Sequence, residues 1–117
     1  MTPDQVRVLA LALPGVTEAD HHGRASFRVE GRILATVPDA EAVNVMAGED
    51  EARAAAQEHP DCCVLLWWGR RLSGVRVELH SAPPDLVAEL LQEAWHRRAS
   101  ARLRAEREPD VRPGDGS

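Results

Sequence analysis

Arginine gives this chain its best candidates for binding chemistry. All 14 basic residues are arginine, and the planar guanidinium donates paired hydrogen bonds to phosphate and carboxylate groups. Eight arginines stand in or beside predicted strands or at the end of the last predicted helix, and they form our candidate nucleic-acid or anion-binding set: Arg24, Arg28, Arg32, Arg70, Arg71, Arg76, Arg97 and Arg98. Arg28 and Arg32 flank a predicted turn, so we expect them to lie near each other. The alternative is a mixed solvated surface that nearby acids (Glu30, Asp39, Glu78) partly neutralise.

The end of the last predicted helix is the most arginine-rich segment. It continues beyond Arg97 and Arg98 with Arg102, Arg104 and Arg107. This run is the strongest single indication of nucleic-acid binding, although at helical spacing its members spread around the axis rather than forming one stripe. A solubilising helix end is the alternative interpretation.

Tryptophan supplies a second candidate for binding. Trp67 and Trp68 are neighbours in a predicted strand, so one indole is expected to point inward and the other outward. An exposed indole at the mouth of a hairpin can stack on a base or contact a protein. Partial burial under the last helix is the alternative. Trp95 continues an apolar helical stripe and is expected in the core.

Residues that suggest catalysis or metal binding do not form a complete set. His21 and His22 have Asp20 beside them, but adjacent histidines rarely reach one ion together, and a metal site needs at least three converging ligands. Ser26 lies near His22 without the glycine-flanked turn of a serine nucleophile. We therefore expect no catalytic residues, no metal and no cofactor, and a protein that is not an enzyme.

The two cysteines, Cys62 and Cys63, are adjacent in the chain. Consecutive strand residues point to opposite faces, so a disulfide between them would be strained. We expect one buried thiol and one outward thiol in a reducing compartment.

Composition and charge limit the classes of protein. A chain of 117 residues with 44% apolar and 28% charged residues is typical of one compact domain. No apolar run approaches the roughly 20 residues that span a bilayer, and Asp4 and Arg7 interrupt any signal-peptide pattern, so we expect a cytoplasmic protein without membrane contact. Residues 1–95 carry 8 arginines against 15 acids, which gives −7, whereas residues 96–117 carry +2. Such an acidic body opposes general binding to phosphate backbones.

Hydrophobic periodicity predicts alternating groups of helices and strands. A first helix begins at Pro3, capped by Thr2 and Gln5, and ends before Pro14-Gly15; a polar loop follows through Gly23. The remaining expected elements are strands over Ser26–Glu30, Arg32–Val37 and Ala42–Met46, a helix over Glu49–His59, strands over Cys62–Trp67 and Val75–His80 joined by a polar loop over Gly69–Gly74, and a last helix from Pro83.

The expected fold class is therefore α+β, in the order α-β-β-β-α-β-β-α. Short connections between consecutive strands indicate an antiparallel five-stranded sheet, with helices packed on one or both of its faces. The core is expected to include Phe27, Val29, Ile33 and Leu34. Residues 1–104 are expected to form a single domain, and residues 105–117 a disordered tail with little apolar content.

Three segments of the chain resemble the MmcQ/YjbR family of small bacterial proteins: LALALPGVTE, HGRASFRVEGRILATV and VRVELHSAPPDLVAELLQEAW. The likeness runs from about Val6 to about Arg98. It implies an α-β3-α-β2-α fold, and it implies DNA binding through a double-wing architecture, without an agreed enzymatic activity. This chain departs from the family pattern because it lacks the lysines common in relatives and places Trp67 and Trp68 upstream of the usual aromatic position.

These observations favour a non-enzymatic binding module whose partner is DNA. The alternative is a module that binds a protein or a small ligand, and an enzyme is a remote third possibility. We expect a monomer or a weak dimer.

Overall fold

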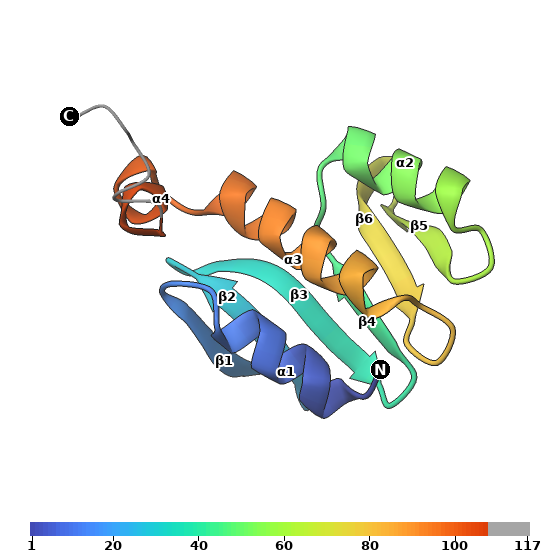
Figure 1. The fold of residues 1–117 in the computed structure, drawn as a ribbon, viewed down its shortest axis with the longest axis horizontal. Coiled ribbons are helices and arrows are strands. Elements are labelled where there is room, and N and C mark those ends of the chain that lie inside the picture. Colours follow the sequence, from blue (N-terminus) through green and yellow to red (C-terminus); the bar gives the residue numbers. More distant parts are fainter. Residues whose placement is uncertain (108–117) are drawn as a thin grey trace.

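The computed structural model describes residues 1–107 and shows an α+β architecture (Figure 1). The elements in chain order are α1 (Pro3–Leu11), β1 (Val16–His21), β2 (Arg24–Val29), β3 (Arg32–Asp39), β4 (Ala42–Val45), α2 (Glu49–Glu58), β5 (Cys63–Trp68), β6 (Arg71–Glu78), α3 (Pro84–Arg98) and α4 (Ala101–Arg107). The strands form one antiparallel sheet in the order β1-β2-β3-β4-β6-β5.

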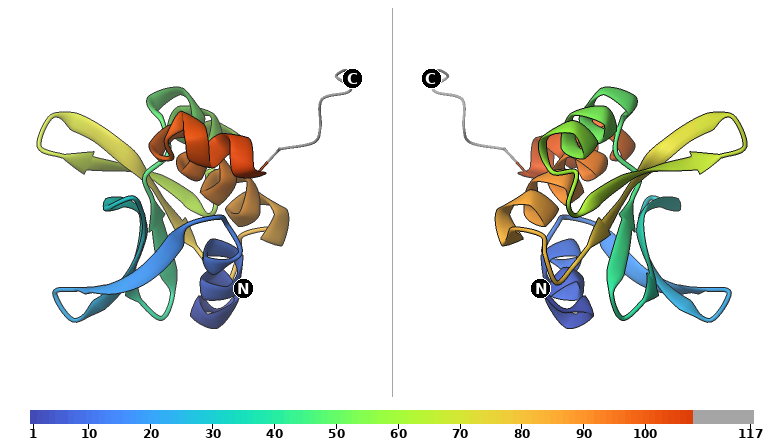
Figure 2. Two further views of the ribbon diagram at one scale, coloured as in Figure 1. Left: turned by 90° about the vertical axis from the view of Figure 1, so that its left-hand side faces the viewer. Right: turned by 90° about the vertical axis from the view of Figure 1, so that its right-hand side faces the viewer.

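The sheet has one covered face and one open face. Helices α1, α2 and α3 pack on the same side, while the β1–β2 and β5–β6 hairpins extend away from them (Figure 2). We call the side turned away from these helices the open face. Along the middle of the sheet it presents Thr36, Asn44 and Arg76, which are paired in register across β3, β4 and β6. This arrangement leaves a concave surface between two hairpins.

The five-strand prediction was wrong because Val16–His21, expected as a polar loop, forms a sixth strand. β1 pairs only with β2, at the edge of the sheet, and most of its side chains are partly or fully exposed. An edge strand needs few apolar residues, so the pattern used to find buried strands misses it. The turn that follows contains His22 and Gly23, both with positive φ (56° and 81°), as a tight two-residue hairpin requires.

The predicted loop Gly69–Gly74 is also shorter than expected. The turn contains only Gly69 and Arg70, and β6 begins at Arg71. Gly74 lies inside the strand, where only glycine fits, because a Cβ at that position would collide with the carbonyl oxygen of Val45 on β4. The glycine that suggests a loop in the sequence therefore permits a close approach of two strands.

The core lies between the sheet and the helices. Phe27, Val29 and Leu34 are buried there, as predicted, but Ile33 is only partly buried and lines the open face instead. A β-bulge between β2 and β3 explains the difference, because it shifts the alternation of side chains. The predicted core position of Trp95 is confirmed, and its indole Nε1 donates a 2.8 Å hydrogen bond to the carbonyl of Pro14.

The prediction of one outward thiol was wrong, because Cys62 and Cys63 are both buried and free. Cys62 precedes β5, so strand alternation does not apply to it. The two sulfur atoms lie 3.8 Å apart, too far for a disulfide. Burial, followed by the hydrogen bond with Cys62, raises the pKa of Cys63 to about 12.

The arginine-rich C-terminal segment is not one continuous helix. α3 ends at Arg98, Ala99 is extended, and α4 follows as a separate helix whose first turn is bonded to Ser100. Residues 105–107, which were predicted to belong to a disordered tail, are helical. The rest of the predicted tail, residues 108–117, lies outside the described residues. None of the helices described in residues 1–107 is long and apolar enough to cross a membrane.

Candidate functional site

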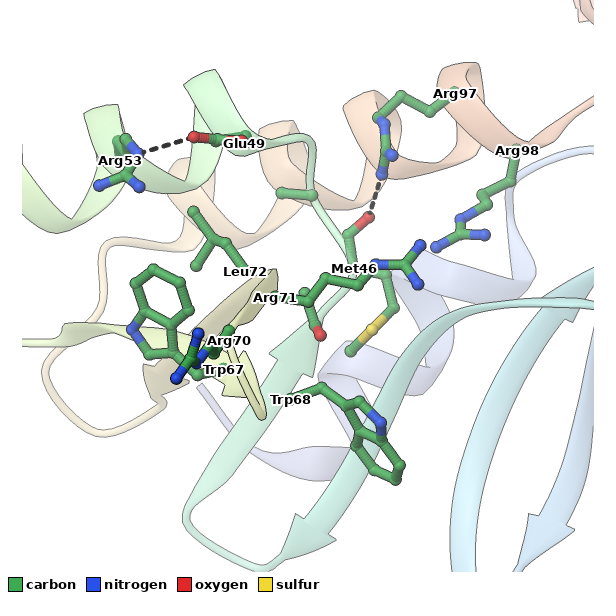
Figure 3. A pocket seen from close by; sticks show the side chains of 12 residues that line it. Met46, Glu49, Arg53, Trp67, Trp68, Arg70, Arg71, Leu72, Arg97 and Arg98 are labelled. Atoms are coloured by element: carbon green, nitrogen blue, oxygen red, sulfur yellow. Dashed lines mark hydrogen bonds and ion pairs between the residues drawn. The ribbon is translucent and has the colours of Figure 1, made fainter.

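Five arginines surround one pocket of about 690 Å³. It lies where the tip of the β5–β6 hairpin, the start of α2 and the end of α3 meet (Figure 3). We call it the arginine pocket, after Arg53, Arg70, Arg71, Arg97 and Arg98. The acid among its lining residues is Glu49. Tertiary structure thus gathers four members of the predicted arginine set, although they come from two segments more than 20 residues apart in the chain.

Arg98 is at the centre of the positive charge. Burial lowers its pKa first, and the charges of Arg97, Arg32 and Arg71 lower it further. In Figure 3 the guanidinium groups of Arg71 and Arg98 point toward each other beside Met46. The Nε atom of Arg98 is buried, with no hydrogen-bond partner among the described residues. Converging like charges of this kind favour a bound anion, which would relieve the repulsion.

The other arginines of the pocket are held in part by the protein. Arg97 donates a 2.9 Å hydrogen bond to the carbonyl of Met46, and it also lies near Glu93. Arg53 forms a 3.2 Å ion pair with Glu49. Among residues 1–107, no acid forms an ion pair with Arg70, Arg71 or Arg98. These three are therefore the groups most available to a ligand.

Both hairpin tryptophans are exposed at the pocket, and neither lies under the last helix. Trp67 is 48% exposed and faces α2, where the guanidinium carbon of Arg53 lies 5.9 Å from the ring centroid. Trp68 is 79% exposed, and its indole points away from Trp67, past the side chain of Met46 (Figure 3). The expectation that one indole points inward was wrong, because both are exposed, and Trp68 is the more accessible of the two.

The arginine pocket continues into a hollow of about 640 Å³ on the open face. The two share Met46, Trp67, Trp68, Ser73 and Arg98. The hollow extends over Asn44 and Thr36 to His21, His22 and Arg24 at the β1–β2 hairpin. We call the arginine pocket and this hollow together the groove. The Oδ1 atom of Asn44 is buried in it without a hydrogen-bond partner among the described residues.

The expected proximity of Arg28 and Arg32 is contradicted by the register. Arg32 is opposite Val29, whose side chain is in the core, so Arg32 lies on the helix side, where it donates a 3.2 Å hydrogen bond to the carbonyl of Arg98. Arg28 is next to Val29 in β2 and points to the other face, where its Nε donates to the Ser26 hydroxyl. The two arginines therefore cannot form one binding pair.

The charge of Arg76 is neutralised by nearby acids, as the alternative interpretation of the arginine set expects. It forms ion pairs of 3.1 Å with Glu78 and 3.5 Å with Asp39. The hydrogen bond with Glu78 is the first cause that raises its pKa. Because its charge is already compensated, we exclude Arg76 from the site.

The residues considered for catalysis make contacts within the β1–β2 hairpin. Ser26 is fully buried, and its hydroxyl donates a 2.9 Å hydrogen bond to the carbonyl of Ala19 across the β1–β2 pair. The rings of His21 and His22 lie 4.6 Å apart at the hairpin turn. Within the described part of the chain, no three histidine, cysteine or acidic side chains are grouped to hold a metal.

Arg53 and Asn44 are among the groove residues that were not predicted from the sequence. Arg53 stands among acids and alanines in α2 and carries no local signal, because only the fold of the β5–β6 hairpin brings it to Trp67. Asn44 does carry one: it is a polar residue between Val43 and Val45, inside an apolar strand. A buried amide in such a strand needs a partner from another element or a ligand.

A comparison with known protein families assigns most of the chain to one family. The family model of YjbR matches residues 11–97, which is most of the chain. No curated protein and no solved structure matches the chain significantly. The matched residues include every strand and all of α2, and reach the penultimate residue of α3. The chain therefore belongs to the YjbR family, the MmcQ/YjbR family that its sequence resembles.

Proposed function

We propose that this protein is a non-enzymatic DNA-binding module that contacts phosphate groups in the arginine pocket. The observation that carries this function is the convergence of Arg32, Arg71 and Arg97 on Arg98, whose Nε has no partner among the described residues. Guanidinium groups recognise phosphate oxygens through paired, charge-assisted hydrogen bonds. A phosphate in the pocket would supply the negative charge that the surrounding side chains do not.

The net charge of −5 limits how the chain can bind DNA. An acidic protein gains little from long-range attraction to a phosphate backbone, so contact must be local. Arg70, Arg71 and Arg98 are the unpaired cations of the pocket among the described residues. Three phosphate contacts predict that the logarithm of the association constant falls with the logarithm of salt concentration with a slope of about −2 to −3. Binding to bacterial DNA also requires the cytoplasmic location inferred from the sequence.

A salt series tests this function directly. Fluorescence anisotropy of labelled single-stranded and duplex oligonucleotides would be measured with the wild type and with Arg71→Gln and Arg98→Gln. Each substitution should weaken binding and reduce the salt slope by about one. Arg7→Gln is the matched control, because Arg7 lies on α1 in an ion pair with Glu18, outside the groove. Absence of binding even at low salt, or equal affinity of all four proteins, would overturn the function.

A protein-binding module is the second candidate, and the outer strand β5 favours it. β5 pairs with β6 on one side only, and it exposes Val64 (57%) as well as Trp68. An exposed apolar edge strand is a ready site for a partner chain. Pull-down with the wild type and with Val64→Lys separates the two functions: a partner lost with Val64→Lys but retained with Arg98→Gln would support protein binding.

A further inference from the structure

We infer that the groove binds single-stranded DNA, with an unpaired base stacked on Trp68 and the adjoining phosphate held by Arg71 and Arg98. This inference rests on the proposed DNA binding and adds the form of DNA that the site selects. It depends on three features of the groove: the accessibility of Trp68, its position beside an arginine, and the unsatisfied polar atom in the groove floor.

Trp68 has the exposure that a stacking platform needs. Its side chain is 79% exposed and lines both the arginine pocket and the hollow on the open face. A face of the indole can therefore receive a flat ring from within the groove. In duplex DNA each base face is covered by the next base pair, so only base edges are presented to a protein. A stacking surface is therefore of use mainly for bases that have left the duplex.

The register of the β5–β6 hairpin places a phosphate-binding group next to this platform. Trp68 and Arg71 are direct cross-strand partners, so their side chains leave the sheet on the same side. Arg71 and Arg98 in turn lie close enough for each charge to affect the other (Figure 3). Base and phosphate belong to one nucleotide. The Trp68 indole and the Arg71 guanidinium lie side by side, so they can bind the base and the phosphate of the same nucleotide.

The floor of the groove offers a hydrogen bond that the protein does not fill. Asn44 lies on the open face between Thr36 and Arg76 in register, and its buried Oδ1 has no partner among residues 1–107. Buried amide oxygens without partners are uncommon, because each costs free energy. The exposed edge of an unpaired base carries N–H groups that can satisfy this oxygen. Arg24, at the opposite end of the hollow, supplies a cation for a phosphate further along the strand.

The charge distribution also fits one strand better than two. Three arginines without an ion pair among residues 1–107 (Arg70, Arg71 and Arg98) meet at one end of the groove, while Arg76 in the middle of the sheet is neutralised by Glu78 and Asp39. A duplex carries two phosphate backbones and about twice the charge per unit length of one strand, so a few cations neutralise a smaller share of its charge. A single strand can follow the one line from Arg98 to Arg24 along the concave surface between the hairpins.

The test compares one sequence in two forms. The affinities of a labelled single-stranded oligonucleotide and of the same sequence in a blunt duplex are measured for the wild type, Trp68→Ala, Trp68→Phe and Arg7→Gln. We expect the wild type to prefer the single strand, Trp68→Ala to lose about tenfold of that affinity, and Trp68→Phe to recover most of it. Arg7→Gln, on α1 outside the groove, is the control and should keep both the affinity and the preference.

The outcomes separate this inference from the function on which it rests. If neither oligonucleotide binds, DNA binding itself fails. If the duplex binds as tightly as the single strand and Trp68→Ala changes neither affinity, while Arg98→Gln weakens both, DNA binding stands and the single-strand inference is overturned. A ribonucleotide strand of the same sequence is measured alongside, and tighter binding of that strand would overturn the assignment to DNA.

Discussion

At the scale of single residues, the neighbours of an arginine determine whether its charge is available to a ligand. Arg76 and Arg98 are both arginines in predicted candidate positions, yet Arg76 is compensated by two carboxylates whereas Arg98 is surrounded by other arginines. The hydrogen bond with Glu78 is the first cause that raises the pKa of Arg76, whereas burial, followed by the charges of neighbouring arginines, lowers the pKa of Arg98. Only Arg98 therefore gains from binding an anion.

Substitutions of the buried Trp95 and the exposed Trp68 test how much burial of tryptophan contributes to the free energy of unfolding. Trp95 is 2% exposed and donates to the Pro14 carbonyl, so Trp95→Phe should lose about 1–2 kcal/mol of unfolding free energy with that hydrogen bond. Trp95→Ala should lose about 3–5 kcal/mol. Trp68→Phe is the control and should stay within about 0.5 kcal/mol. Urea denaturation measures all three, and an equal loss at both positions would contradict the assigned burial.

At the scale of elements, a single carboxylate joins a hairpin turn to the last helix. Glu30 occupies the β2–β3 turn with positive φ, and its side chain accepts hydrogen bonds from the Ser100 backbone nitrogen (2.7 Å) and hydroxyl (2.9 Å). The Ser100 hydroxyl in turn accepts from the Leu103 nitrogen at the start of α4. Because a seven-residue helix is marginal alone, this contact contributes to holding α4 in place.

The same contact predicts a pH dependence of α4. The Ser100 backbone and hydroxyl groups, and then Arg32, lower the pKa of Glu30, so the folded form favours the ionised carboxylate. Its stabilising effect is complete above the ordinary glutamate pKa of about 4.3 and is lost as pH falls through the lowered value. Amide hydrogen exchange of Leu103 and Arg104 should therefore accelerate, relative to the sheet, at acidic pH.

Glu30→Gln is the control for this effect. The amide side chain has nearly the same shape but does not titrate, so α4 in the variant should show weaker protection at neutral pH and little further change on acidification. If the wild-type helix exchanged at the same relative rate across this pH range, Glu30 would not anchor it.

At the scale of the whole molecule, one core connects both hairpins to all three long helices. The cluster of buried residues includes Val6 from α1, Phe27 from β2, Ala52 from α2, Val75 from β6 and Trp95 from α3. Neither hairpin has an apolar core of its own, because the buried side chains of both belong to the one cluster that the sheet shares with the helices. The groove between the hairpins therefore depends on the integrity of this single core.

This single core predicts cooperative unfolding. Thermal or urea transitions followed by far-ultraviolet circular dichroism and by tryptophan fluorescence should coincide, as in a two-state domain. The two probes report different regions, because the tryptophans lie on α3 and the β5–β6 hairpin while helical signal also comes from α1 and α2. Separate midpoints would show that the hairpin and the helices unfold independently.

The sequence by itself predicted the α+β class, α1 with its cap, the β2–β3 turn, the positions of most strands and the core role of Trp95. These features depend on local periodicity, capping residues and turn chemistry, which are encoded within a few neighbouring residues. The sequence also predicted the family likeness that the family model confirms. It missed β1, because an edge strand needs little apolar content.

Only the tertiary structure decided which polar residues share a site. Arg28 and Arg32 are four residues apart but lie on opposite faces, since a hairpin register and a bulge determine which way each points. Arg71 and Arg98 are 27 residues apart but converge, since the end of α3 packs beside the β5–β6 hairpin. Convergence of this kind depends on long-range packing, and no local spacing in the sequence encodes it.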